Sequence, residues 1–329
     1  MKIGVVGAGG WGTAVARLLS EGGHTVCLWA RRPEQAEAIA RDRENRSYLP
    51  GVRLPETGLT VTSDLPTVTA AELIVLAVPS FAMDETAARI GRAADGKPII
   101  SLAKGMDRTS QSTMSAVIRS RLRPRSVFAL SGPSHAEEVG RDVPTAVVLA
   151  GDDLDEGERL QRAFATPRFR VYLSGDLVGV ELCATVKNVI ALATGVSDGL
   201  GYGDNSRGAL ITRGLAEMGR FGRTFGARPA TFFGLSGLGD LVATCTSPHS
   251  RNRGVGERLG RGEKLETILQ TMRMVAEGVY ATDIVHAVAR ERGIEMPITD
   301  AVYRLLHAEA SPLDLVEEIM TRTPKREDA

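Results

Sequence analysis

The chain has 329 residues, 43% of them hydrophobic, and its 40 basic and 40 acidic side chains give a formal net charge of zero. This length and composition predict a soluble globular protein of two domains. A balanced charge provides no overall attraction to nucleic acid or to an anionic membrane surface, so any anion must be recognised locally.

The sequence offers no feature typical of export, membrane insertion or metal binding. Residues 2–6 already resemble a strand, and no uninterrupted apolar run reaches the roughly 20 residues that cross a bilayer. The three cysteines, Cys27, Cys183 and Cys245, lie far apart, which argues against a disulfide framework and against a metal cluster. We therefore expect an unprocessed cytoplasmic protein with no metal site.

The first half of the chain alternates apolar β-rich runs with helical patterns. Strands are predicted at 2–6, 25–30, 59–62, 72–78, 98–103, 127–131 and 144–150. Helices are predicted at 11–22, 33–44, 80–94, 110–122 and 155–165. This alternation is typical of an α/β fold built on a doubly wound, mostly parallel sheet.

The alternation stops at about Leu177, and the second half of the chain reads as helical. Helices are predicted at 178–197, 206–220, 264–272, 277–292 and 311–322, separated by glycine-rich loops. We therefore predict a Rossmann-type dinucleotide-binding domain over residues 1–180 and an all-α substrate-binding domain over residues 181–329.

A glycine-rich turn, GAGGWG, follows the first predicted strand. Gly7, Gly9 and Gly12 occupy the three positions of the dinucleotide-binding fingerprint. Glycines let the backbone approach a pyrophosphate, whose charge is met by free N–H groups at the start of the next helix. A tight turn without a ligand is the alternative, but the place of the motif at the first strand–helix junction favours a cofactor site.

Two arginines, Arg31 and Arg32, follow the second predicted strand. An acidic residue there would accept hydrogen bonds from the ribose of NAD, whereas a guanidinium can pair with a 2′-phosphate or stack on adenine. The sequence therefore predicts that NADP is at least tolerated, with Arg31 the closer residue. The alternative for one of the pair is a solvated arginine leading into the helix at Pro33.

Lys187 lies within a long predicted helix, in an apolar setting. Its neighbours one turn away are Cys183, Ala184, Ile190 and Ala191. Partial desolvation would lower the pKa of this lysine from about 10.4 and let it exchange a proton near neutral pH. Periodicity alone leaves open the alternative that Lys187 extends to solvent from the edge of the helix.

The segment 234–260 combines Asp240 with the polar run Ser250, Arg251 and Asn252. A hydroxyl, a guanidinium and an amide side by side suit a phosphate ester. Taken alone, a solvated basic loop remains the alternative, and Asp240 could equally cap a helix or form a turn.

Two predicted strands end in residues that suit a ligand. Lys104 follows one strand, and Gly132 and Ser134 follow another. Both sets lie at the carboxyl edge of the sheet, where open α/β folds bind ligands. We expect Lys104 to meet an anion, whereas Ser134 could belong either to a ligand site or to an ordinary turn. We assign no role to His135, because a lone histidine is more often structural.

Several segments together resemble one enzyme family. They are GAGGWGTAVA, AKGMD, SGPSHAEEV, ELCATVKNVIALATGVSDGL, NSRGALITRGLAEM, GLSGLGDLVATCTSPHSRNRGVG and VAEGV. Their order and spacing resemble those of the bacterial-type glycerol-3-phosphate dehydrogenases that use NAD or NADP, and the resemblance covers nearly the whole chain. It implies interconversion of dihydroxyacetone phosphate and sn-glycerol 3-phosphate, supply of glycerophospholipid synthesis, and a homodimer.

The resemblance also implies roles for individual residues. The lysine matching Lys187 is the catalytic proton donor and acceptor of that family. Cofactor contacts fall on Gly10, Trp11, Arg31, Arg32, Lys104, Ala136, Arg251, Val275 and Glu277. Substrate contacts fall on Lys104, Gly132, Ser134, Lys187, Asp240, Ser250, Arg251 and Asn252.

The sequence departs from the family pattern at three positions. Gly10 stands where serine is common, His135 replaces a frequent phenylalanine, and Gly208 replaces a frequent alanine. None of the three touches the implied chemistry, although Gly10 could change cofactor affinity.

Two other functions remain open. One is a Rossmann-type hydroxyacid dehydrogenase. The Ser250–Asn252 run argues against it, because a carboxylate substrate has no phosphate for these side chains to bind. The other is a sensor that binds NADPH and performs no chemistry.

Overall fold

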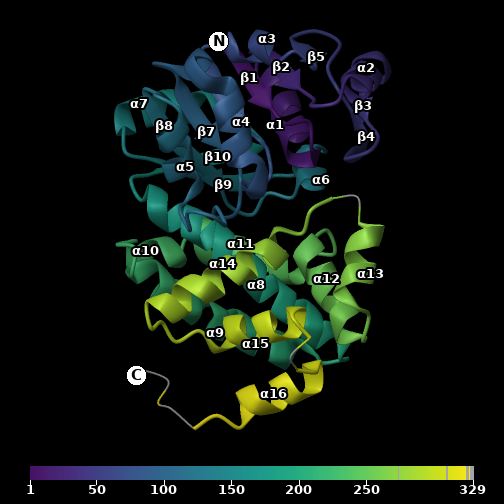
Figure 1. The fold of residues 1–329 in the computed structure, drawn as a ribbon. Coiled ribbons are helices and arrows are strands. Elements are labelled where there is room, and N and C mark those ends of the chain that lie inside the picture. Colours follow the sequence, from purple (N-terminus) through teal and green to yellow (C-terminus); the bar gives the residue numbers. More distant parts are fainter. Residues whose placement is uncertain (273, 309, 324–325, 327–329) are drawn as a thin grey trace.

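The computed structural model describes residues 1–272, 274–308, 310–323 and 326, and within them an eight-stranded sheet fills the upper half of Figure 1. Its strands are β1 (Lys2–Val6), β2 (Thr25–Trp29), β5 (Leu59–Thr62), β6 (Leu73–Leu76), β7 (Pro98–Ser101), β8 (Ser126–Ser131), β9 (Thr145–Gly151) and β10 (Phe169–Ser174). Their order is β10-β9-β8-β7-β6-β1-β2-β5, with β8 and β9 antiparallel and the other neighbours parallel. The predicted doubly wound, mostly parallel sheet is confirmed.

The chain winds outward from β1 in both directions, because β1 pairs with β2 on one side and β6 on the other. The carboxyl ends of β1 and β6 therefore flank the point where the winding reverses, which is where such sheets bind ligands. The residues that follow β1, β6, β7 and β8 all emerge at this edge, toward the second half of the molecule.

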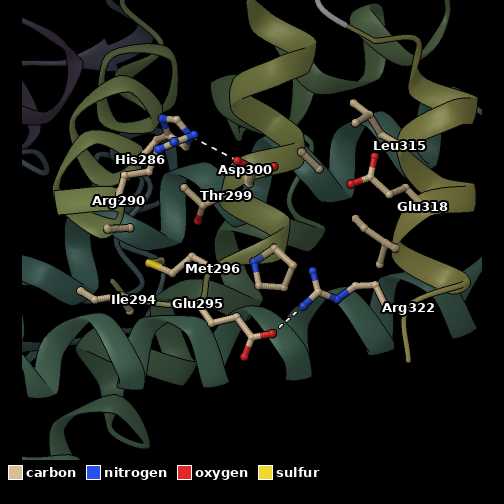
Figure 2. A pocket seen from close by; sticks show the side chains of 14 residues that line it. His286, Arg290, Ile294, Glu295, Met296, Thr299, Asp300, Leu315, Glu318 and Arg322 are labelled. Atoms are coloured by element: carbon tan, nitrogen blue, oxygen red, sulfur yellow. Dashed lines mark hydrogen bonds and ion pairs between the residues drawn. The ribbon is translucent and has the colours of Figure 1, made fainter. Parts of the chain in front are cut away.

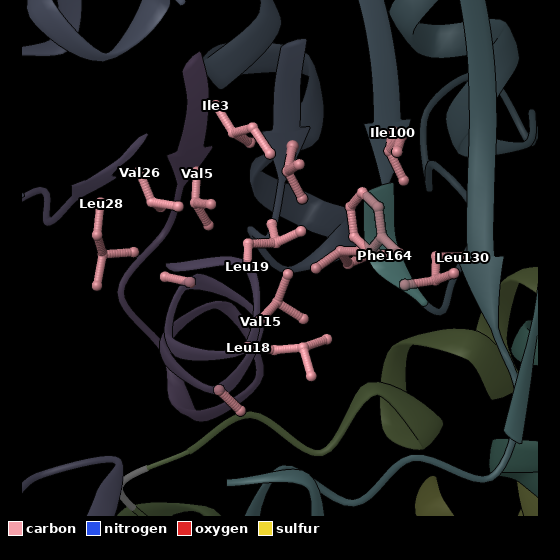
Figure 3. Packing of buried hydrophobic residues seen from close by; sticks show 14 of the residues in the cluster. Ile3, Val5, Val15, Leu18, Leu19, Val26, Leu28, Ile100, Leu130 and Phe164 are labelled. Carbon is pink, nitrogen blue, oxygen red and sulfur yellow. The ribbon is translucent and has the colours of Figure 1, made fainter. Parts of the chain in front are cut away.

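Helices cover both faces of the sheet and bury its apolar strands. On one face, side chains of α1 (Gly10–Glu21), α2 (Pro33–Asp42) and α7 (Leu154–Phe164) pack in one cluster. Figure 3 shows Val15, Leu18 and Leu19 of α1 close to strand residues of this cluster. On the other face lie α3 (Leu65–Thr69), α4 (Met83–Ile90) and α5 (Met114–Arg121).

The lower half of Figure 1 is helical and is organised around α8 (Leu177–Gly199). The other helices are α9 (Asp204–Arg223), α10 (Pro229–Phe232), α11 (Asp240–Thr246), α12 (Arg251–Gly260), α13 (Leu265–Thr271), α14 (Glu277–Glu291), α15 (Pro297–Leu306) and α16 (Pro312–Met320). By length and composition α8 could cross a membrane, but 89% of its apolar stretch is buried inside the protein, as in a core helix.

Glycines bring α12 unusually close to α8. A Cβ added at Gly256 would lie 2.1 Å from the Leu192 carbonyl oxygen, and one added at Gly195 would lie 2.0 Å from the Arg253 carbonyl oxygen. Side chains larger than glycine would force these backbones apart. The close packing fixes the start of α12 relative to α8, the helix that carries Lys187.

The sequence missed several short elements and placed some boundaries wrongly. The missed elements are the hairpin of β3 (Glu44–Asn45) and β4 (Leu49–Arg53), the strand β10, the helices α3, α10, α11 and α12, and α15. The short helix α6 (Ala136–Val139) has Glu137 and Glu138 in its first turn. The helix predicted at 80–94 is broken, because Gly91 adopts a φ of +51° and ends α4. The sheet ends at Ser174 and α8 begins at Leu177, so a domain boundary at residue 180 would fall inside α8; the division itself stays a prediction.

Candidate active site

The turn after β1 has two glycines that its own packing requires and one that leaves space. Gly7 has a φ of +123°, and a Cβ there would lie 2.6 Å from the Ala77 carbonyl oxygen. A Cβ at Gly12 would lie 2.0 Å from the Gly7 carbonyl oxygen. At Gly9, by contrast, no atom of the described residues lies within 4 Å of the Cβ position. The open side of the turn is therefore at Gly9.

The start of α1 suits the pyrophosphate of a dinucleotide. Gly9 caps this helix without a side-chain hydrogen bond, so the first backbone N–H groups remain available to an anion. The side chain of Trp11 packs against the sheet core, 6.5 Å from the ring of Phe169, and its buried Nε1 has no hydrogen-bond partner within the described chain. The backbone of Trp11, rather than its indole, is thus placed for a cofactor.

Gly10 accommodates two neighbouring loops. A Cβ there would lie 2.7 Å from the Tyr48 carbonyl oxygen and 3.5 Å from the Cβ of Ala136. The structure therefore places Ala136, the first residue of α6, beside the glycine turn. It also accounts for glycine in place of the common serine, because a side chain would push against the β3–β4 hairpin.

Arg31 and Arg32 follow β2 at the same edge of the sheet. Both are exposed, and neither forms an ion pair with another residue that the structure describes. Arg32 immediately precedes α2, as the helix beginning at Pro33 requires. Free guanidinium groups next to an open glycine turn fit the adenosine end of NAD or NADP.

Two lysines share one buried carboxylate where the sheet meets the helical half. Lys187 Nζ donates to Asp240 Oδ1 at 2.6 Å and to Thr244 Oγ1 at 2.7 Å. Lys104 Nζ donates to Asp240 Oδ2 at 2.8 Å and to the Gly132 carbonyl oxygen at 3.0 Å, and it lies 3.5 Å from Ser134 Oγ. The structure thus brings together residues that the sequence left on four separate segments.

The burial of this cluster changes its proton affinities. Lys187 is 4% exposed, and burial lowers its pKa to about 7, helped by the charge of Lys104 and opposed by Asp240. Burial alone would raise the pKa of Asp240, but the two ammonium groups outweigh it and lower that pKa. Lys187 can therefore exchange a proton near neutral pH, while Asp240 stays ionised.

A chain of side-chain amides connects Lys104 to the helical half. Asn188 donates to the Lys104 carbonyl oxygen at 3.1 Å, and Asn252 donates to Asn188 Oδ1 at 2.9 Å. The backbone N–H of Gly278 in turn donates to Asn252 Oδ1 at 2.9 Å. Asn252 thus helps to connect the parts of the site. The hydrogen bonds described here use only one of its two amide hydrogens.

The polar run at 250–253 forms the start of α12 rather than a solvated loop. Ser250 is buried and caps the helix by accepting from the Arg253 N–H at 3.2 Å. Arg253 turns away to pair with Asp198 at 2.7 Å, whereas Arg251 stays exposed and donates to the Val275 carbonyl oxygen at 2.7 Å. A helix start beside an exposed guanidinium is suited to a phosphate.

Glu277 joins the two halves at the same edge. Its carboxylate accepts from the backbone N–H of Ser80 at 2.9 Å and from Ser80 Oγ at 2.5 Å. Ser80 follows β6, so α14 is fastened directly beside the predicted cofactor site.

A separate pocket of about 210 Å³ lies between α14, α15 and α16 (Figure 2). Its lining side chains pair with one another, since His286 lies 3.2 Å from Asp300, and Arg322 donates to Glu295 at 2.5 Å. It contains none of the predicted site residues.

Sequence reasoning missed three polar residues of the site: Asn188, Thr244 and Ser80. Asn188 adjoins Lys187, and Thr244 lies one turn after Asp240 on α11, so the spacing of both held a signal. Ser80 held none, because its partner Glu277 lies 197 residues away.

Comparisons with known proteins show the family to which the chain belongs. Family profiles of the N-terminus and C-terminus of NAD-dependent glycerol-3-phosphate dehydrogenase match residues 2–156 and 176–317. A glycerol-3-phosphate dehydrogenase (NAD(P)+) of Chlorobium limicola is 48% identical over 331 residues, which is 99% of each chain. The crystal structure of a glycerol-3-phosphate dehydrogenase from Coxiella burnetii has a TM-score of 0.93 and 40% identity, over 98% of this chain and 99% of that one.

More distant structures share the fold alone. A ketopantoate reductase from Ralstonia eutropha JMP134 has a TM-score of 0.63 and 18% identity, over 94% of this chain and 98% of its own. The chain is nearly half identical to the Chlorobium limicola enzyme over its full length, and both family profiles match it. The chain therefore belongs to the NAD-dependent glycerol-3-phosphate dehydrogenase family.

Proposed function

We propose that the cluster of Lys187, Asp240 and Lys104 reduces dihydroxyacetone phosphate to sn-glycerol 3-phosphate with NAD(P)H, and catalyses the reverse reaction. As a member of its family the chain is an oxidoreductase that uses NAD or NADP. The observation that carries the proposal is a buried lysine with a pKa of about 7, hydrogen-bonded at 2.6 Å to an ionised carboxylate. The site would lie between the two proposed domains, residues 1–180 and 181–329.

The turn after β1 and the residues around it would hold the cofactor. Open space at Gly9, the uncapped start of α1 and the free guanidinium groups after β2 support this assignment. When bound, the nicotinamide supplies the hydride that adds to the C2 carbonyl of the substrate. The proposed cofactor contacts are Gly7, Gly9, Gly10, Trp11, Gly12, Arg31, Arg32, Lys104, Ala136, Arg251, Val275 and Glu277.

Lys187 would supply the proton. As an ammonium it donates to the oxygen that becomes the C2 alkoxide, and as a neutral amine it accepts that proton in the reverse direction. Asp240 and Thr244 hold its Nζ in place, at 2.6 and 2.7 Å. Lys104 brings a second positive charge to the same carboxylate.

The phosphate of the substrate would bind at the start of α12. Ser250 and Asn252 are buried there and Arg251 is exposed, which is supporting geometry for an anion. The proposed substrate contacts are Lys104, Gly132, Ser134, Lys187, Asp240, Ser250, Arg251 and Asn252. A hydroxyacid substrate is not favoured, because the chain's family is that of the glycerol-3-phosphate dehydrogenases.

We also propose the cellular setting that the resemblance implies. The enzyme would act in the cytoplasm as a homodimer and supply glycerol 3-phosphate to glycerophospholipid synthesis. The buried position of α8 supports a protein without membrane insertion.

The test is a steady-state comparison of NADH and NADPH with dihydroxyacetone phosphate, repeated on Arg31→Ala. We expect substrate-dependent oxidation of both cofactors. Arg31→Ala should raise the KM for NADPH about tenfold more than the KM for NADH, because it removes a charge-assisted contact to the 2′-phosphate. Arg168→Ala, which alters an exposed arginine just before β10, is the matched control and should change neither KM. NADPH binding without substrate-dependent oxidation would instead identify a sensor.

A further inference from the structure

The segment that carries Lys104 is a tight loop between β7 and α5. The backbone of Asp107 donates to the Ser112 carbonyl oxygen at 2.9 Å, and Met106 pairs with Thr113. Lys104 therefore lies only two residues from the base of this loop, and any movement of the base moves Lys104.

The Glu181 carboxylate of α8 binds the end of this loop that leads into α5. Glu181 is 3% exposed and accepts from the backbone N–H of Ser115 at 2.7 Å and from Ser115 Oγ at 2.5 Å. Thr113, the residue that precedes α5, forms no side-chain cap of its own. Glu181 thus caps a helix of the sheet half from within the helical half.

The end of the loop that carries Lys104 and Met106 also contacts the helical half. Met106 is 1% exposed and packs in the hydrophobic cluster of that half. Asn188 binds the Lys104 carbonyl oxygen at 3.1 Å. Helix α8 carries Glu181, Asn188 and Lys187. The same helix therefore carries the proposed catalytic lysine and binds the loop that carries Lys104.

We propose that Glu181 is a positioning residue, which fixes the Lys104 ammonium relative to Lys187 and Asp240 by capping α5. This inference rests on the proposed function, since it takes Lys104 as a substrate contact. Without the cap, the base of the loop loses two hydrogen bonds in a buried place, and Lys104 is no longer held at 2.8 Å from Asp240 by a rigid support.

The position of Lys104 can be measured through Lys187. The groups that act on the Lys187 ammonium are Asp240 of α11 and Lys104, and His135 and Cys245 also lie within its electrostatic reach. Lys104 lowers the pKa of Lys187, so a displaced Lys104 would let that pKa rise. Glu181 itself is faced by Ser115, Thr113 and Arg119, and it acts on Lys187 through the loop.

The test compares Glu181→Met with Glu217→Met in the full chain. Glu217 is a matched control: it is equally buried and caps α15 by accepting from Ile298 N at 2.6 Å and from Thr299 N and Oγ1 at 3.1 and 2.9 Å. Both variants lose a buried cap, but only Glu181→Met releases the Lys104 loop.

We expect Glu181→Met to lower kcat/KM for dihydroxyacetone phosphate about tenfold or more and to shift the alkaline limb of its pH profile upward by about half a unit. The Kd for NADPH, from fluorescence titration, should stay within about twofold of the wild-type value, since the glycine turn is untouched. Glu181→Gln can keep both hydrogen bonds to Ser115, so the alkaline limb of its pH profile should lie at the same pH as in the wild type.

If Glu181→Met does not fold, Ser115→Ala replaces it, because it removes one of the two bonds and should shift the limb in the same direction. The inference is overturned if the limb stays in place, or if it moves equally in Glu217→Met. An inactive wild-type enzyme would refute the proposed function instead, before any variant is compared.

Discussion

Lys187, Lys104 and Asp240 leave one uncompensated positive charge in a buried site when Lys187 is protonated. The whole chain carries no net charge, so this local excess is what an anionic substrate would meet. The same arrangement explains why Lys187 can both give and take a proton: burial disfavours its charge, and a single carboxylate shared with Lys104 restores only part of that loss.

The pKa of Lys187 predicts opposite pH profiles for the two directions. Reduction needs the ammonium, so its kcat/KM should be level below pH 7 and fall about tenfold per unit above it. Oxidation needs the neutral amine, so its kcat/KM should rise through pH 7 and then level off. Initial rates from pH 5.5 to 9.5 provide the check, and a limb near the ordinary lysine pKa would refute the role of burial.

Single residues were predictable where one segment held the whole signal. Lys104 follows a strand and lies at the carboxyl edge of the sheet, as expected. Lys187 stood among apolar helix neighbours and is buried, although periodicity alone left a solvent-exposed position open. Periodicity did not identify their shared partner, because Asp240 lies 53 residues from Lys187 and 136 from Lys104, and only the family resemblance implied a place for Asp240 in the site. Periodicity shows which side chains share a face, but not which distant carboxylate will meet them.

At the scale of elements, three helical segments take their caps from buried or partly buried glutamates elsewhere in the chain. Glu277 binds Ser80 before α4, Glu181 binds Ser115 in α5, and Glu217 binds Thr299 in α15. Burial raises the pKa of all three carboxyl groups. Two of the three caps, those of Glu277 and Glu181, join the helical half to the sheet half. They help to fix the elements of the site relative to one another.

The glycine turn predicts a contrast between two substitutions. Gly12→Ala should destabilise the protein by about 1–3 kcal/mol, because its Cβ would meet the Gly7 carbonyl oxygen at 2.0 Å. Gly9→Ala should leave stability unchanged, since space is open there and its φ of −78° suits alanine, but should weaken NADPH binding by occupying that space. Thermal unfolding and fluorescence titration separate the two effects. Tight NADPH binding by Gly9→Ala would contradict the assigned cofactor site.

Glu217 predicts a pH-dependent stability within the helical half. Burial raises its pKa from 4.5 to about 7, so the folded state holds the proton more tightly than the unfolded state does. The stability that this proton provides is complete below pH 4.5 and is lost as the pH rises through 7. Relative to wild type, Glu217→Gln should therefore gain about 3 kcal/mol between pH 4.5 and 8.

Urea unfolding of both proteins at several pH values within that range measures this difference. A difference between wild type and Glu217→Gln that does not change with pH would show that Glu217 does not titrate in this window.

At the scale of the whole molecule, the active site belongs to neither half alone. The sheet supplies Lys104 and the glycine turn, and the helical half supplies Lys187, Asp240 and the start of α12 (Figure 1). The alternation of the first half was strong enough to predict the sheet, because its central strands are apolar on both faces. The helical half was less predictable: α12 has three glycines and a polar start, and its close packing against α8 helps to stabilise it as a helix.

The most direct test of the whole account is the rate of NADPH oxidation by Lys187→Ala in the presence of dihydroxyacetone phosphate. We expect a rate at least about a thousandfold below that of wild type, because the variant has no group to protonate the alkoxide, while the Kd for NADPH stays close to the wild-type value. Lys264→Ala, an exposed lysine before α13, is the control and should retain full activity. A near-normal rate in Lys187→Ala would contradict the central claim.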